Sequence, residues 1–99
     1  MLSQILELYS RCGESLGKIG IDEAVLPICE INNALNLFMQ NKILILGGDL
    51  YIKSDSDNFE NLYADWFYEG VNYSESILDA KNYLSRFEDG NIYVSFVFK

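Results

Sequence analysis

Residues 42–53 read Lys-Ile-Leu-Ile-Leu-Gly-Gly-Asp-Leu-Tyr-Ile-Lys, and the other predicted elements are placed around this segment. Its four consecutive aliphatic residues, 43–46, offer no polar face, which is typical of a strand covered on both sides. The pair Gly47-Gly48 then interrupts the strand, and glycines inside a strand mark a bulge, a bend or the close approach of another backbone. We therefore predict a central strand that is kinked at the two glycines. An anion-binding nest at the same place is disfavoured, because Asp49 follows at once.

The elements around this strand follow from hydrophobic spacing and turn residues. Pro27 suits the first turn of a helix, because its missing N–H is not needed there. The segment before it is expected to form a loop or single turn over 14–20 and at most one helical turn over 21–26. The remaining predicted elements are helices over 3–12, 27–40 and 74–86, the last with Ser74 as its N-cap, and strands over 42–53, 63–69 and 92–98.

These elements predict an α+β fold in one domain, residues 1–99, with the order helix, helix, strand, strand, helix, strand (ααββαβ). The aliphatic strand belongs in the middle because it lacks a polar face. We therefore predict a three-stranded antiparallel sheet of order 2-1-3, packed with about three helices. Trp66, Tyr68 and Tyr93 either complete the core or form an interaction surface on a sheet face that the helices leave open.

The composition gives no sign of catalysis. The chain has no histidine, the commonest general base and metal ligand, and its two cysteines, Cys12 and Cys29, are far apart in sequence. Both thiols are expected to pack as small apolar side chains. Asp55 and Asp57 have the spacing of the start of a calcium loop, but the later glycine and glutamate of such a loop are missing. We predict no catalytic, cofactor-binding or metal site.

Charge is the informative property of this composition. The 99-residue chain has 15 acidic and 7 basic residues, a net charge of −8, which disfavours nucleic acid and anionic membranes as partners. No apolar run is long enough to span a membrane and no signal peptide is evident, so a cytoplasmic protein is expected. Residues 54–79 contain no Lys or Arg and these seven acids: Asp55, Asp57, Glu60, Asp65, Glu69, Glu75 and Asp79. Such a segment is either a solvated surface or a binding surface for a basic partner.

Three features together resemble a known family: an aliphatic strand leading into Gly47-Gly48-Asp49-Leu50-Tyr51, the run Asp65-Trp66-Phe67-Tyr68-Glu69, and a Ser-Glu helix start. The chain is most similar to the immunity protein 40 family of bacterial polymorphic toxin systems, from about Gly20 to the C-terminus. Leu50 stands where valine is expected and Phe67 where tyrosine is. The resemblance implies an α+β, cytoplasmic, non-catalytic protein that binds and neutralises a toxin made beside it, as in contact-dependent growth inhibition.

We therefore expect an immunity protein that blocks a basic toxin domain stoichiometrically, a nuclease being one such toxin. A small-ligand or regulatory module that uses the Gly47-Gly48 bend is the alternative from another class, and an enzyme acting through acids alone is a third. The expected toxin-binding residues are the acids of segment 55–69 and three aromatic residues: Tyr51, Asp55, Asp57, Glu60, Asp65, Trp66, Tyr68 and Glu69.

Overall fold

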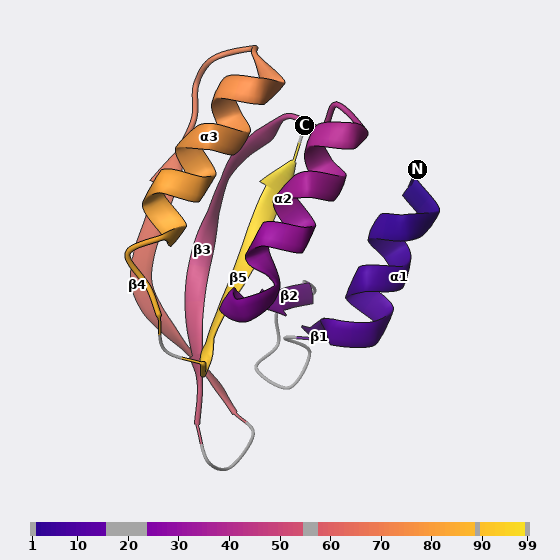
Figure 1. The fold of residues 1–99 in the computed structure, drawn as a ribbon. Coiled ribbons are helices and arrows are strands. Elements are labelled where there is room, and N and C mark those ends of the chain that lie inside the picture. Colours follow the sequence, from indigo (N-terminus) through magenta and orange to yellow (C-terminus); the bar gives the residue numbers. More distant parts are fainter. Residues whose placement is uncertain (1, 16–23, 55–57, 89, 99) are drawn as a thin grey trace.

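A single sheet with three helices forms the architecture of the protein (Figure 1). The computed structural model describes residues 2–15, 24–54, 58–88 and 90–98. Its elements, in chain order, are α1 (Leu2–Cys12), β1 (Glu14–Ser15), β2 (Ala24–Pro27), the 3-10 turn η2 (Ile28–Glu30), α2 (Ile31–Gln40), β3 (Ile45–Lys53), β4 (Phe59–Phe67), α3 (Tyr73–Leu84) and β5 (Ile92–Phe98).

The sheet has five antiparallel strands in the order β1-β2-β5-β3-β4, so the prediction of a three-stranded sheet and of ααββαβ topology is wrong. The two additional strands, β1 and β2, are short. They exist because β2 pairs with β5, Leu26 lying opposite Val94, and β1 pairs with β2. The aliphatic strand β3 lies between β4 and β5, where its lack of a polar face requires it to be.

Residues 24–27 form strand β2 rather than a helical turn, and α2 begins at Ile31 rather than at Pro27. Pro27 adopts an extended conformation, with φ −66° and ψ 146°, and closes the strand opposite Tyr93. A proline is tolerated at a strand end, because little of the ladder is lost there. The expected loop or turn over 14–20 is also interrupted, since Glu14 and Ser15 form β1. Residues 16–23 lie outside the described part of the chain.

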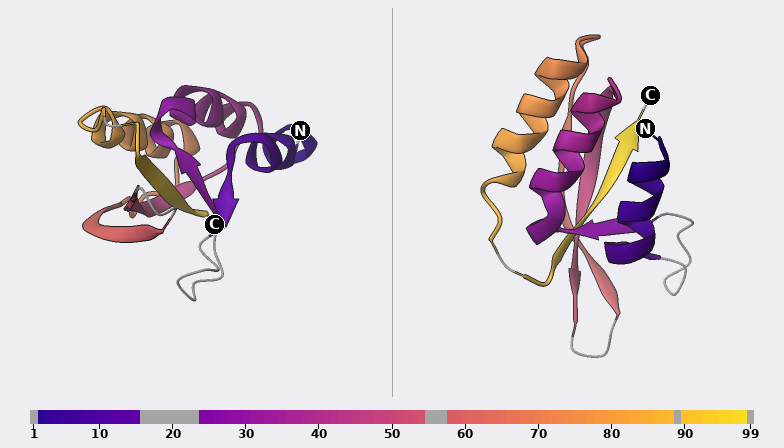
Figure 2. Two further views of the ribbon diagram at one scale, coloured as in Figure 1. Left: turned by 90° about the horizontal axis from the view of Figure 1, so that it is seen from below. Right: turned by 45° about the vertical axis from the view of Figure 1, so that its right-hand side comes forward.

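The helices lie on one face of the sheet, as the end-on view in Figure 2 shows. Between the two layers is the main core, a cluster that includes Phe38 of α2, Ala80 of α3 and Leu50 of β3, all fully buried. Cys12 packs against this cluster. Cys29 is exposed, so the expectation that both thiols are packed is wrong for this residue, which lies in the turn before α2.

The predicted kink at the two glycines is confirmed. The pairing of β3 with β5 shifts register between Ile45 and Gly47, and Gly47 has a φ of 147° that side chains rarely adopt. A Cβ atom at Gly47 would collide with the carbonyl oxygen of Trp66. Both glycines therefore allow neighbouring strands to approach a bent β3 closely.

A second, smaller cluster lies on the other face of the sheet. It consists of Val25, Tyr51 and Phe59, with Tyr93 packed against it. The ammonium nitrogen of Lys53 lies 5.9 Å from the ring centres of both Phe59 and Tyr93 and 2.8 Å from a carboxylate oxygen of Glu14. Lys53 thus joins β1 to the end of β3 across the edge of this cluster.

Candidate functional site

The expected binding residues differ in their exposure to solvent. Tyr51 and Trp66 are buried, Tyr68 is half-buried, and Glu60, Asp65 and Glu69 are exposed. Asp55 and Asp57 lie outside the described residues. Three acids in this set are therefore open to a partner, whereas two of the three aromatic residues are enclosed in the free chain.

Trp66 belongs to the main core beneath the helices. Its indole stacks on the ring of Tyr83 at 5.2 Å between centres and meets Phe96 edge-on at 6.0 Å. Its ring N–H has no hydrogen-bond partner among the described residues. Tyr51 is enclosed in the second cluster. Both rings therefore pack inside the protein and are not part of its exposed binding surface.

Tyr68 fixes the loop between β4 and α3. Its hydroxyl donates to the Oε1 atom of Glu75 at 2.9 Å and accepts from the backbone N–H of Asn72 at 3.3 Å. Withdrawal of the hydroxyl from water and the bond to Glu75 raise the pKa of Tyr68. Gly70 lies against the tyrosine ring, with no room for a Cβ atom. Tyr68 therefore sets the position at which Glu69 is presented.

The exposed acids do not share one face of β4. Asp65 pairs with Asp49 and Glu60 pairs with Ile52, and residues alternate between the faces along each strand. Because Leu50 belongs to the main core, Ile52 and Glu60 point to the helix side, whereas Asp49 and Asp65 point to the opposite side. Glu69 lies in the loop that follows β4. The acids therefore surround the outermost strand instead of forming one flat patch.

Sequence reasoning missed several apolar side chains that accompany these acids. Tyr63 is 91% exposed, Phe67 76% and Val71 88%, all within or just after β4. Large exposed apolar side chains beside acids are typical of protein interaction surfaces. For Phe67 a signal was present, because strand alternation places it with Asp65 and Glu69 on the polar face.

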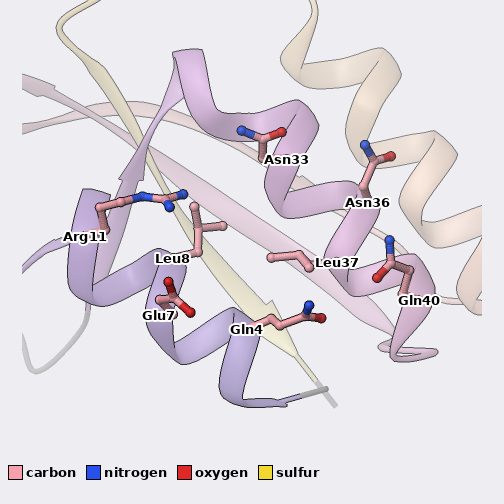
Figure 3. A pocket seen from close by; sticks show the side chains of 8 residues that line it. All are labelled: Gln4, Glu7, Leu8, Arg11, Asn33, Asn36, Leu37 and Gln40. Carbon is pink, nitrogen blue, oxygen red and sulfur yellow. The ribbon is translucent and has the colours of Figure 1, made fainter.

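A groove of about 420 Å³ lies between α1 and α2 and is drawn in Figure 3. Leu8 and Leu37 form its apolar part, and the acid Glu7 and the base Arg11 balance each other. Its remaining lining residues are four carboxamides: Gln4, Asn33, Asn36 and Gln40. The groove contains none of the expected binding residues and no excess of negative charge.

No group of three or more His, Cys, Asp or Glu side chains in the described ranges is arranged to hold a metal ion. Likewise, none of the helices described is long and apolar enough to cross a membrane.

The chain was compared with family models, curated proteins and solved structures. The family model described as Immunity protein 40 matches residues 15–98. The matched region contains α2, α3 and every strand, apart from Glu14 at the start of β1. Neither the curated proteins nor the solved structures gave a significant match. The matched region covers most of the chain, and the protein therefore belongs to the immunity protein 40 family.

Proposed function

We infer that this protein is an immunity protein that binds a cognate bacterial toxin domain stoichiometrically and neutralises it, in the cytoplasm of the cell that makes both. Family membership over residues 15–98 is the observation that carries this proposal. The protein acts by occupying a surface of the toxin and performs no catalysis of its own. The toxin belongs to a polymorphic toxin system of the kind used in contact-dependent growth inhibition.

The charge of the chain supports a basic toxin. Its net charge is −8, and Glu60, Asp65 and Glu69 are exposed around β4. Nucleases are one class of toxin with a basic active site, because their substrate is a polyanion. Complementary charge would accelerate encounter by about 10 to 10³-fold, which favours rapid capture of free toxin.

We assign the steering role to the acids of segment 55–69: Asp55, Asp57, Glu60, Asp65 and Glu69. In this proposal Tyr51 and Trp66 hold the strands that present the acids, and Tyr68 holds the loop that carries Glu69. Removal of charge should then lower the association rate, whereas loss of exposed rings should raise the dissociation rate.

The first experiment is co-expression with the toxin domain encoded beside this protein. A 1:1 complex on co-purification, together with rescue of growth, is the expected result. Absence of both would overturn the proposed function.

The second experiment tests the acidic segment. Association is measured against ionic strength for the parent and for the triple variant Asp55→Asn, Asp57→Asn, Glu60→Gln. The parent rate should fall as salt rises, and the triple variant should associate more slowly at low salt. The matched control, Glu7→Gln, Asp79→Asn, Glu88→Gln, changes the net charge equally at three exposed positions outside the segment. Equal association rates for both triple variants would contradict a local role of the segment. An apolar small-molecule ligand would show no such dependence on salt.

A further inference from the structure

The sheet face opposite the helices bears two neighbouring rows of side chains, each crossing β4, β3 and β5. We call Asp65, Asp49 and Ser95 the acidic row, and Phe67, Gly47 and Val97 the apolar row. Both rows face away from the core, because the alternate residues Leu50, Val94 and Trp66 lie in it. Within the acidic row Asp65 is exposed, Asp49 is half-buried and Ser95 is buried. No described helix covers this face (Figure 2).

The apolar row is open to solvent at both ends. Phe67 is 76% exposed and Val97 44%, and Gly47 between them contributes no side chain. The row therefore has an exposed apolar side chain at each end and a depression at Gly47. We call Phe67 and Val97 the apolar shoulders. A sheet face with exposed apolar shoulders has the shape and composition of a protein contact surface.

The acidic row places two carboxylates directly opposite each other on adjacent strands. Asp49 pairs with Asp65 in the strand ladder, and only Asp65 is exposed. A cation of a partner can therefore bind the carboxylate of Asp65. Arginine suits the position better than lysine, because a planar guanidinium can bind carboxylates in a fork and stack on an aromatic ring. Phe67, the next outward-facing residue of β4 after Asp65, provides such a ring.

Tyr63 stands beside these rows in a bulge of β4. Between the pairs Asp49–Asp65 and Tyr51–Asn61, the three residues 62–64 oppose the single residue Leu50. Tyr63 has a φ of 57°, its N–H is bonded to the side chain of Asn61, and its ring is 91% exposed. A tyrosine is unfavourable in this conformation, and its exposed ring gains almost no burial in return.

We propose that the exposed part of this face, formed by Tyr63, Phe67, Val97 and Asp65, is where the toxin domain docks, and that it receives an arginine side chain of that basic protein. This inference rests on the proposed immunity function and assigns it a contact surface. Tyr63 and Phe67 are the apolar anchors, and the exposed Asp65 binds the guanidinium. The overall charge of −8 favours a basic partner at this face over a second copy of the same acidic chain.

Tyr63→Gly is the sharpest test, because it removes the ring and also relieves the unfavourable φ. The thermal midpoint should be no lower than that of the parent, while dissociation of the purified toxin domain should become at least about tenfold faster. Lys42→Gly is the matched control. Lys42 has a φ of 54° and follows the C-cap of α2, where the N–H of Ile43 bonds to the carbonyl of Phe38 at 2.9 Å. This control should also keep the thermal midpoint and should leave dissociation unchanged.

A charge-matched pair tests the acidic row. Asp65→Asn and Asp79→Asn each remove one exposed acid, so both change the net charge equally. Only Asp65→Asn should accelerate dissociation. Each arginine of the toxin domain is then replaced by alanine, and in combination with one of these variants Asp65→Asn should have no further effect. If no toxin arginine shows such coupling to Asp65 in a double-mutant cycle, the arginine assignment is overturned.

A second pair tests the apolar shoulders and the competing surface between α1 and α2. Phe67→Ala should accelerate dissociation, whereas Leu6→Ala, at a residue of α1 that is 69% exposed, should not. Asn36→Ala should likewise have no effect, because it lies in the carboxamide-lined groove.

The outcomes separate the two proposals. If the parent binds and rescues growth but Tyr63→Gly, Asp65→Asn and Phe67→Ala bind like the parent, the docking face is wrong and the immunity function stands. Weakening by Asn36→Ala instead would place the contact in the groove. If the parent neither binds nor rescues, both proposals fall.

Discussion

The indole ring of Trp66 packs on the bare backbone of Gly48, its ladder partner in the neighbouring strand. A Cβ atom at Gly48 would lie 2.7 Å and 2.8 Å from the Cη2 and Cζ3 atoms of this ring, and 2.5 Å from the carbonyl oxygen of Ser95. The second glycine of the pair therefore makes room for the largest side chain of the core.

Gly48→Ala is expected to lower the free energy of unfolding by about 1–3 kcal/mol, because the added methyl group must displace the indole or the backbone of β5. Gly90→Ala is the control, since a Cβ atom there would meet nothing within 4 Å. Urea unfolding followed by the fluorescence of Trp66, the one tryptophan of the chain, measures both. Equal stability of the two variants would contradict the packing argument.

Asn72→Ala is expected to cost about 1 kcal/mol of stability, because it removes the N-cap of α3. The Oδ1 atom of Asn72 accepts the N–H of Glu75 at 3.0 Å. Ser74, which the sequence suggested as the cap, lies inside the first turn, so Ser74→Ala should change stability by only a few tenths of that amount. Chemical denaturation of the two variants discriminates between the caps, and a larger loss for Ser74→Ala would reverse the assignment.

Tyr9 is expected to make the fold sensitive to alkali. Burial raises the pKa of Tyr9 from 10.0 to about 12. Between these values the unfolded chain loses the phenolic proton while the folded chain keeps it, so stability falls as pH rises through this window. The loss amounts to about 2–3 kcal/mol at the alkaline end. Between pH 10 and pH 12 the thermal midpoint of Tyr9→Phe should fall less than that of the parent. Below pH 10 the two proteins should show the same pH dependence. Parallel curves for parent and variant would refute this account.

The sequence predicted the long elements and missed the short ones. The aliphatic run before Gly47 indicates the central strand because it is short, rich in isoleucine and directly followed by two glycines, which together favour a strand over a buried helix. Ala24–Pro27 has only 4 residues, too few to show a period, and its proline fits a helix start as well as a strand end. Its extended conformation is decided by pairing with β5, whose residue Val94 is 68 residues away from its partner Leu26 in the sequence.

The candidate site was harder to predict, because exposure depends on where the helices lie. Alternation along β4 separates Trp66 from Phe67 but does not say which face is covered. The bulge at Tyr63 depends on three residues of β4 fitting against one of β3, and no local pattern marks it. The exposed acids were predictable from composition, since acidic side chains are seldom buried without partners.

The helices cover only one face of the sheet, and this divides the sequence into two sets of positions under different constraints. Changes at Leu50 or Val94 disturb the packing that all three helices share, whereas changes at Phe67 or Val97 alter a surface that contributes little to that packing. A gene duplicate could therefore exchange its outward-facing strand residues one at a time while still folding. Such a scaffold can adapt its binding surface to a partner that changes during evolution, while its core stays the same.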